Sequence, residues 1–276
     1  MLPLSPSART ATIDAEPAQA IPLDPNGYRY TGTFYLYIES GSLRSAKVVV
    51  PLVLKELSPV GVLDVGCGAG AWLSEYKNHG ITDFRGVDGD YVPASSLLIP
   101  ADHFRSQDVT LKFDLGRRFS LVQCLEVGEH LPTDFSRVLV ENLTVHGDVI
   151  LFSAATPGQG GENHINEQTR EFWRLLFAEH SYKPFDLFRP MIRGNRSVES
   201  WYRHNIILYV AEKAIPTLPL TVFYSGIPDG QPIPDLASLV YKIRARVLSL
   251  LPNWCVSKLA LIKHHIVIAC RRLSGR

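Results

Sequence analysis

The sequence has few cysteines, no long apolar run and no recognisable export signal. Its 276 residues include four cysteines that form neither a C-x-x-C pair nor the His/Cys spacing of a zinc site: Cys67, Cys124, Cys255 and Cys270. This absence excludes a disulfide scaffold and favours a reduced, cytoplasmic chain. The longest uncharged run, residues 214–228, contains three prolines, and a bilayer span needs about 20 apolar residues, so we expect no membrane span. Asp14 and the lack of an apolar core near it argue against a signal peptide.

Acidic residues are absent from the last part of the chain. The whole chain has 28 Lys and Arg against 27 Asp and Glu, a formal charge of +1. After Asp235 there are eight basic residues and no acidic one, so the chain combines a body of charge −7 with an end of charge +8. The formal charge of +1 therefore hides a basic segment, and this segment is where a partner should be sought. The composition, 46% apolar and 20% charged, excludes a disordered chain and a coiled coil.

Short apolar segments alternate with amphipathic ones over the middle of the chain. Strands are predicted at residues 61–65, 84–87, 119–125, 148–153 and 205–210, with a further strand ending near residue 107. Helices are predicted at residues 40–57, with an interruption at Pro51, and at 71–77, 136–143 and 167–180. This alternation predicts an α/β fold, a doubly wound Rossmann-like, mostly parallel seven-stranded sheet with helices on both faces. A C-terminal helical extension follows it.

A glycine-rich turn follows the first predicted strand. The run V-L-D-V-G-C-G-A-G places three glycines between a strand and a helix, which lets the backbone approach a ligand closely: Gly66, Gly68 and Gly70. Their G-x-G-x-G spacing differs from the G-x-G-x-x-G of dinucleotide-binding proteins, which disfavours a nicotinamide-dependent oxidoreductase. Asp64, two residues before the first glycine, does not suit a pyrophosphate. It suits a ligand that carries a cation, such as the amino acid and sulfonium of S-adenosylmethionine.

Two further acidic residues lie at the ends of consecutive predicted strands. Asp88 comes 18 residues after Gly70, where an acid accepts hydrogen bonds from both ribose hydroxyls. Asp108 lies at the expected end of the third strand, where it can face an adenine amino group. A tight structural turn alone would explain the glycines, but the three acids together favour a nucleoside site.

These motifs resemble those of class I S-adenosylmethionine-dependent methyltransferases. The resemblance covers about residues 40–210, through V-L-D-V-G-C-G-A-G, G-V-D-G-D and L-V-Q-C-L-E-V-G-E-H-L. It extends to a bacterial group with F-S-A-A-x-P-G-Q-G-G followed by H-x-N-E-Q, whose members often have no assigned substrate and in part accompany genes for glycans or small metabolites. The resemblance implies the fold and the cofactor S-adenosylmethionine. We assign to the cofactor site, besides the residues above, Gly89 and Glu126.

Carboxylates and imidazoles gather where the acceptor of a methyl group is expected. Glu126, Glu129 and His130 follow the fourth predicted strand, and His164 follows the next one. His130, His164 and Glu129 are the predicted catalytic residues, with one of the two histidines as the general base, since histidine titrates near neutrality. The same E-x-x-E-H pattern resembles that of methyltransferases that hold a divalent cation such as Mg²⁺ with these four side chains. It also occurs without a metal, with the carboxylates capping a turn, and we favour no tightly bound metal.

The sequence leaves the acceptor open. We predict O-methylation of a hydroxyl on a small metabolite or a glycan-like acceptor by in-line displacement. Histidines and carboxylates gather where a hydroxyl acceptor would need a base, and the N-P-P-[YF] motif of many amide- and base-methylating enzymes is absent. The alternatives are N-methylation of a small amine and a nucleoside-binding partner protein that does not catalyse. Residues 189–204 can wall the acceptor pocket or form a surface insertion.

The C-terminal segment repeats a basic amphipathic pattern. Apolar residues at helical spacing over residues 236–251 and 255–266 alternate with Lys and Arg. Such helices can pack on the domain or on a second subunit as a homodimer contact, or lie on an anionic membrane; the segment lacks the interleaved aromatics that favour nucleic acid. We divide the chain into a leader and candidate lid (1–39), a methyltransferase domain (40–212), and a linker with basic helices (213–276). The predicted location is cytoplasmic, with membrane association through residues 236–273 as an option.

Overall fold

The computed structural model describes residue 27 and residues 32–273. It contains a seven-stranded sheet in the order β3-β2-β1-β4-β5-β7-β6. The strands are β1 (Val62–Val65), β2 (Phe84–Asp88), β3 (Phe104–Ser106), β4 (Leu121–Leu125), β5 (Val149–Ser153), β6 (Tyr182–Phe185) and β7 (Ile207–Ala211). The first five strands run parallel, and β7 is antiparallel to both β5 and β6. The predicted doubly wound, mostly parallel seven-stranded sheet is confirmed.

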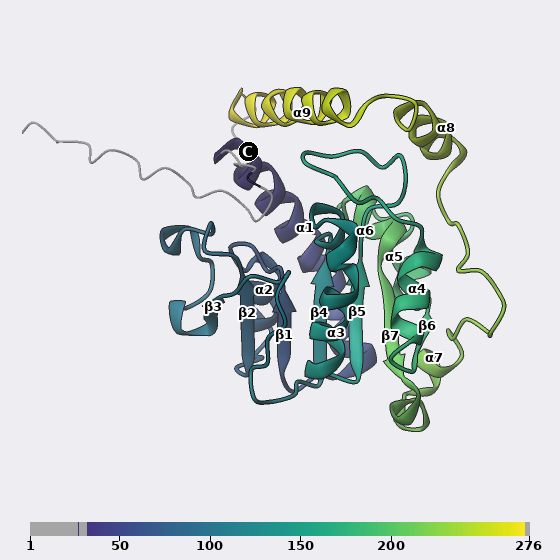
Figure 1. Cartoon of the computed structure of the whole chain (residues 1–276). Coiled ribbons are helices and arrows are strands. Elements are labelled where there is room, and N and C mark those ends of the chain that lie inside the picture. The colour runs from purple at the N-terminus through teal and green to yellow at the C-terminus, as the bar shows by residue number, and fades with distance from the viewer. Residues whose placement is uncertain (1–26, 28–31, 274–276) are drawn as a thin grey trace, which may run out of the picture.

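Helices cover both faces of the sheet, as Figure 1 shows. One apolar cluster joins the sheet to α1 (Gly32–Leu57), α2 (Ala71–Asn78), α5 (Phe188–Ile192) and α6 (Ser200–Asn205). The other joins it to α3 (Ser136–His146) and α4 (Arg170–Ala178). Because the sheet is covered on both sides, β1, β4 and β7 are buried along their whole length, which explains why their sequences are apolar apart from Asp64 in β1 and Gln123 in β4.

Several element boundaries differ from the sequence-based expectation for local reasons. The helix α1 runs through Pro51 without interruption. The predicted helix 167–180 begins only at Arg170, because the Thr169 side chain caps it by accepting a hydrogen bond from Phe172 N. The strand β6 was not located in the sequence; it contains Pro184, which is tolerated at this sheet edge because β6 pairs only with β7.

The chain reverses its direction of winding between β1 and β4. β1 is followed outward by β2 and β3, and the chain then returns to add β4 on the other side of β1. In open α/β sheets, ligands bind at the carboxyl ends of strands beside such a switch point. The acidic residues and glycines singled out in the sequence follow these same strands.

The C-terminal segment forms two helices after the short α7 (Leu220–Phe223). They are α8 (Leu239–Leu248) and α9 (Asn253–Leu273), and α9 packs against α1. Figure 1 shows both helices lying across one end of the molecule, above α1 and α6. Within the part of the chain that the structure describes, no helix is long and apolar enough to cross a membrane. The candidate lid, residues 1–39, lies largely outside the described residues.

Candidate active site

A cavity of about 600 Å³ lies at the carboxyl ends of β1, β2 and β4. Its wall combines the glycine turn after β1, the segment after β4, the loop at residues 159–164, and side chains of α6, α8 and α9. Ligand pockets in proteins commonly have volumes of about 300–1,000 Å³, so the cavity can hold a nucleoside-sized ligand together with a small acceptor. Trp201 and Tyr202 lie in this wall and not in a surface insertion.

The glycine turn forms one end of the cavity. Gly66 and Gly68 have φ values of 77° and 54°, in the left-handed region. A Cβ atom at Gly66 would lie 2.3 Å from Val127 Cγ2, so the turn itself requires this glycine. A Cβ at Gly68 would meet no protein atom within 4 Å, and Gly68 faces the cavity. The structure therefore leaves space for a ligand at Gly68, whereas Gly70 and Gly89 stand outside the cavity wall.

Asp64 and Asp88 point into this end of the cavity. Asp64 is buried, and its Oδ2 atom has no hydrogen-bond partner among the described residues. Burial raises the pKa of Asp64 to about 7, Gln123 offsets part of the rise, and the charge of Asp88 adds to it. A buried carboxylate oxygen without a donor fits a ligand that brings a cation or an N–H group.

Asp88 is held by donors of its own chain. Its carboxylate accepts hydrogen bonds from Gly68 N at 2.6 Å, Gly89 N at 2.7 Å and the Tyr91 hydroxyl at 2.6 Å. Burial raises the pKa of Asp88, and these hydrogen bonds lower it in part. Since each carboxylate oxygen has two lone-pair directions, the Oδ2 atom, which accepts from Gly68 N, retains capacity for a ribose hydroxyl.

Asp108 is not part of the cavity wall, contrary to the expectation that it faces an adenine. Its Oδ1 atom accepts hydrogen bonds from Thr110 N at 2.9 Å and Thr110 Oγ1 at 2.6 Å. This local turn uses the carboxylate to hold its own backbone. The next residue, Val109, lines the cavity instead.

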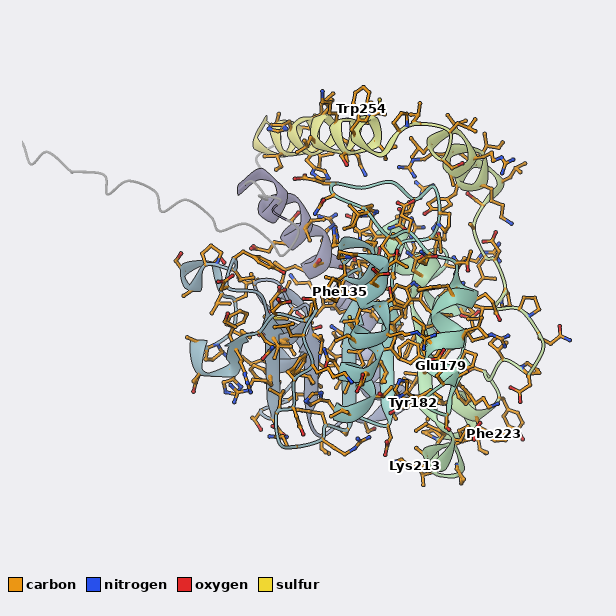
Figure 2. All side chains as sticks on the ribbon, viewed as in Figure 1. Phe135, Glu179, Tyr182, Lys213, Phe223 and Trp254 are labelled. Carbon is orange, nitrogen blue, oxygen red and sulfur yellow. The ribbon has the colours of Figure 1, made fainter. Side chains whose placement is uncertain are left out.

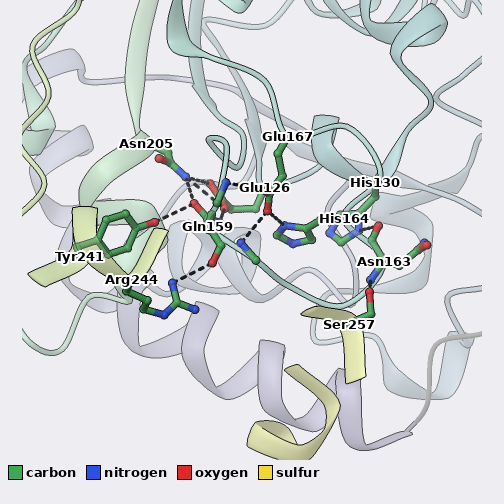
Figure 3. A network of polar contacts seen from close by, with 12 residues as sticks. Glu126, His130, Gln159, Asn163, His164, Glu167, Asn205, Tyr241, Arg244 and Ser257 are labelled. Carbon is green, nitrogen blue, oxygen red and sulfur yellow. Dashed lines mark hydrogen bonds and ion pairs between the residues drawn. The ribbon is translucent and has the colours of Figure 1, made fainter. Parts of the chain in front are cut away.

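Glu126 follows β4 in a strained backbone conformation and is fixed by two amides. Its φ of 56° lies in the left-handed region, which costs a non-glycine residue about 1–3 kcal/mol and is most common at functional sites. The Glu126 carboxylate accepts hydrogen bonds from Gln159 Nε2 at 2.7 Å and from Asn205 Nδ2 at 3.1 Å. Asn205 also donates to Gln159 Oε1 at 2.7 Å, which closes the network seen in Figure 3.

Glu129, His130 and His164 come together beside this network. One donor atom from each lies within 4.8 Å of the others, and the two imidazole rings meet edge to face with centroids 5.0 Å apart. Burial, reinforced by the charge of Glu126, raises the pKa of Glu129 well above its ordinary value. Burial, reinforced by the charge of His164, lowers the pKa of His130 to about 3. His130 is therefore neutral at neutral pH.

Glu167 fixes His164 in one orientation. His164 Nδ1 donates to Glu167 Oε1 at 2.9 Å, and the same carboxylate accepts from Gly158 N at 2.8 Å and Gly160 N at 2.7 Å. This arrangement keeps the proton on Nδ1 and makes Nε2 the basic nitrogen. Nε2 lies against Gly161, where a Cβ would come within 2.1 Å of it. A carboxylate that orients an imidazole is the arrangement of a general base.

Three of the four side chains predicted as metal ligands are brought together, and Glu126 is not among them. The group supplies one carboxylate and two imidazoles, whereas Mg²⁺ prefers six oxygen ligands in octahedral geometry. The Glu126 carboxylate is meanwhile engaged by two side-chain amides. The residues present therefore do not fit Mg²⁺.

The C-terminal helices complete the cavity, with one of their faces turned to the domain. Tyr241, Arg244 and Leu248 of α8 lie in the wall, as do Val256 and Lys263 of α9. Both helices therefore pack on the domain, which is one of the alternatives that the sequence left open.

Contacts between the loop at residues 158–162 and these helices are close. Arg244 Nη1 donates to the Gln159 carbonyl at 2.9 Å. A Cβ at Gly158 would lie 2.2 Å from the Ala245 carbonyl oxygen, and Gly158 has a φ of 80°. On α9, His264 Nδ1 lies 3.2 Å from Glu162 Oε2, with both side chains buried. The glycines of the G-Q-G-G motif therefore allow α8 to approach the loop.

Sequence reasoning missed several residues of the site: Gln159, Glu167, Asn205, Tyr241 and Arg244. Gln159 and Glu167 belong to the quoted G-Q-G-G and H-x-N-E-Q motifs, and that signal could have singled them out. Asn205 had no local signal, because its partner Glu126 is 79 residues away in the chain. Arg244 was assigned only to the basic side of an amphipathic helix, and Tyr241 was not singled out.

The fold and the cavity define a doubly wound α/β protein with a cavity at its switch point, where such proteins bind ligands. A family model described as a methyltransferase domain matches residues 40–186. This match spans more than half of the chain, and the protein belongs to that methyltransferase family. No curated protein matches the chain significantly.

Solved structures share the fold at low sequence identity. A sugar N-methyltransferase, KedS8, from Streptoalloteichus sp. is 17% identical, with 75% of this chain and 99% of that chain covered and a TM-score of 0.50. DesVI from Streptomyces venezuelae is 15% identical over 67% of this chain and 100% of its own, with a TM-score of 0.49. Magnesium protoporphyrin IX methyltransferase from Synechocystis, solved with bound S-adenosylmethionine, is 16% identical over 67% and 86%, with a TM-score of 0.48. At these identities the likeness concerns the fold alone.

Proposed function

We propose that this methyltransferase transfers a methyl group from S-adenosylmethionine to a hydroxyl oxygen of a small metabolite or glycan-like acceptor. The observation that supports it is a single cavity walled at one end by the glycine turn with Asp64 and Asp88, and at the other by His164. The cavity thus unites a cofactor-type end with a base oriented by a carboxylate.

The residues at the cofactor end fit S-adenosylmethionine. Asp64 Oδ2, buried and without a donor, would receive the cationic part of the ligand, and Asp88 would accept hydrogen bonds from the ribose. Gly68 leaves the space for close approach. When bound, the cofactor supplies a methyl group already activated on a sulfonium.

At the acceptor end, His164 removes the proton of the attacking hydroxyl. His164 Nε2 would take the proton of the acceptor hydroxyl as its oxygen attacks the methyl carbon in line and S-adenosylhomocysteine leaves. Glu167 would stabilise the imidazolium that forms. His130, with a pKa of about 3, stays neutral and packs against the His164 ring. Glu129 lies in the cavity wall beside the two histidines, where burial raises its pKa and so favours the protonated form, which can donate a hydrogen bond to the acceptor.

The experiment combines binding with product analysis. Calorimetric titration with S-adenosylhomocysteine and with NAD tests the cofactor, and binding of NAD alone would refute the proposal. Cell extracts incubated with enzyme and S-adenosylmethionine are then searched by mass spectrometry for products heavier by one CH₂ unit. An N-methylated product would contradict the assignment to oxygen.

His164→Gln tests the base, with His265→Gln as a matched control on the exposed side of α9. We expect His164→Gln to lower turnover about 10²–10⁴-fold, the usual contribution of a general base, and to leave S-adenosylhomocysteine affinity unchanged. Glu167→Gln should lower turnover less than His164→Gln does, since Glu167 acts through the imidazole that it orients. Undiminished turnover in His164→Gln would remove this residue from the mechanism.

A further inference from the structure

The helix α8 exposes an apolar stripe on the side that faces away from the cavity. Val240, Ile243 and Val247 recur at helical spacing, and each is more than half exposed. The residues of α8 that line the cavity, such as Tyr241 and Leu248, are offset from this stripe. The helix is therefore apolar on two sides, and packing on the domain accounts for only one of them.

The helix α9 continues this exposed apolar surface. Trp254, Ile262 and Ile266 are each more than half exposed, and so is Leu250 in the turn between the two helices. Figure 2 shows Trp254 on the outer side of α9, pointing away from the domain. We call the set of these seven exposed residues the outer face: Val240, Ile243, Val247, Leu250, Trp254, Ile262 and Ile266. Exposed apolar surfaces that are contiguous and rimmed by polar residues mark interaction sites.

Basic side chains accompany the outer face. Lys242, Arg246 and Lys258 are exposed on the same two helices, and Lys258 lies over the Trp254 ring at 5.2 Å from its centroid. Lys242 is 3.0 Å from Asp235, the last acidic residue of the chain. Beyond that residue the sequence has no acidic side chain, and of its eight basic residues Arg244 and Lys263 line the cavity and are not part of this surface. The surface is thus complementary to a negatively charged partner that also accepts apolar side chains.

We propose that the outer face docks on the surface of an anionic lipid bilayer. A membrane interface satisfies both requirements, because acyl chains receive the apolar side chains and headgroups attract the Lys and Arg residues. Tryptophan is enriched at such interfaces. Neither helix is long and apolar enough to span a bilayer, so both would lie in the plane of the interface. Since their other faces line the cavity, docking places the cavity directly beneath the headgroups.

Vesicle flotation of the full chain tests this proposal. Phosphatidylcholine vesicles are compared with vesicles that also contain phosphatidylglycerol, and binding is expected to the second kind only and to weaken with salt. Arg246→Gln with Lys258→Gln should lower the partition coefficient about 25-fold, at about fivefold for each basic residue near the surface. Ile243→Ser with Trp254→Ser should lower it through the lost apolar contact.

Leu220→Ser is the matched control, because Leu220 is an exposed apolar residue of α7, at another end of the molecule. It should bind vesicles as the unmodified protein does. Calorimetry with S-adenosylhomocysteine on every variant shows that the site is intact, so failure of docking is distinct from failure of the proposed function. Equal binding to both vesicle types, or none to either, would overturn the proposal. So would a dimer in sedimentation velocity that Ile243→Ser with Trp254→Ser dissociates, since the outer face would then join two copies of the chain.

Discussion

Lowering the pH from 7.5 to 5.5 is expected to weaken the binding of S-adenosylhomocysteine about 25-fold. The reason lies in Asp64, whose pKa is raised to about 7, primarily by burial. The ammonium group of the ligand carries its charge below a pH of about 8, and only the ionised carboxylate attracts it. With a pKa of about 7, about three quarters of the Asp64 side chains are ionised at pH 7.5 but only about 3% at pH 5.5, and the ratio gives the expected change.

Isothermal titration calorimetry over this pH range, in buffers of different ionisation enthalpy, measures both affinity and proton release. Binding should release about one proton at pH 5.5 and about a quarter of one at pH 7.5. Asp64→Asn should bind more weakly and lose this pH dependence. Burial also raises the pKa of Asp88, so the pH dependence of binding measured in Asp64→Asn is subtracted from that of the unmodified protein. Affinity that does not change with pH in the unmodified protein, or a change of the same size in Asp64→Asn, would refute the reasoning.

Three further predictions concern stability, the contact between loop and helix, and metals. The pKa of Asp64 is higher in the folded protein, about 7, than in the unfolded chain, about 3.8, so its contribution to stability is present below pH 3.8 and is lost as the pH rises through about 7. The unfolding free energy of the unmodified protein should therefore fall by about 4 kcal/mol between pH 4 and 8 on account of this residue. In Asp64→Asn this decrease should be absent, as measured by urea titration at each pH. Gly158→Ala should loosen α8, since its Cβ would lie 2.2 Å from the Ala245 carbonyl oxygen at a φ of 80°, and limited proteolysis should cut α8 faster than in a Gly194→Ala control. Exhaustive chelation should leave methyl transfer intact, and activity restored only by added Mg²⁺ would contradict the proposed His164 mechanism.

The sheet could be predicted from the sequence where its strands carry their own signal. β1, β4 and β5 are short, mostly apolar segments, because each is covered on both faces, and this pattern can be seen in the sequence without the structure. β6 has four residues and includes Pro184, so nothing local distinguishes it from a loop until β7 pairs with it. The helical pattern of the sequence extends over residues 167–169, but α4 begins only at Arg170 because the Thr169 side chain caps it there.

The site divides in the same way. The sequence by itself determined the glycine turn with Asp64 and the position of Asp88 at the end of β2, because the turn, the strand ends and the acids lie close together in the chain. It also brought His130 and His164 to neighbouring strand ends. Only the tertiary structure decided that Gln159 and Asn205 hold the Glu126 carboxylate, because they lie 33 and 79 positions away from it in the chain. The contacts of Asp108 with Thr110 and of Glu167 with His164 are local, and the sequence reasoning missed them.

The tertiary structure likewise decided that α8 and α9 close the cavity. Local periodicity defines the faces of a helix but not which face meets the domain, because that choice depends on contacts between residues far apart in the chain. Arg244 meets the Gln159 carbonyl 85 residues away, and Gly158 admits the backbone of α8 only because it lacks a Cβ. The sequence therefore defined two amphipathic basic helices, and packing assigned one face of each to the cavity and left the other exposed.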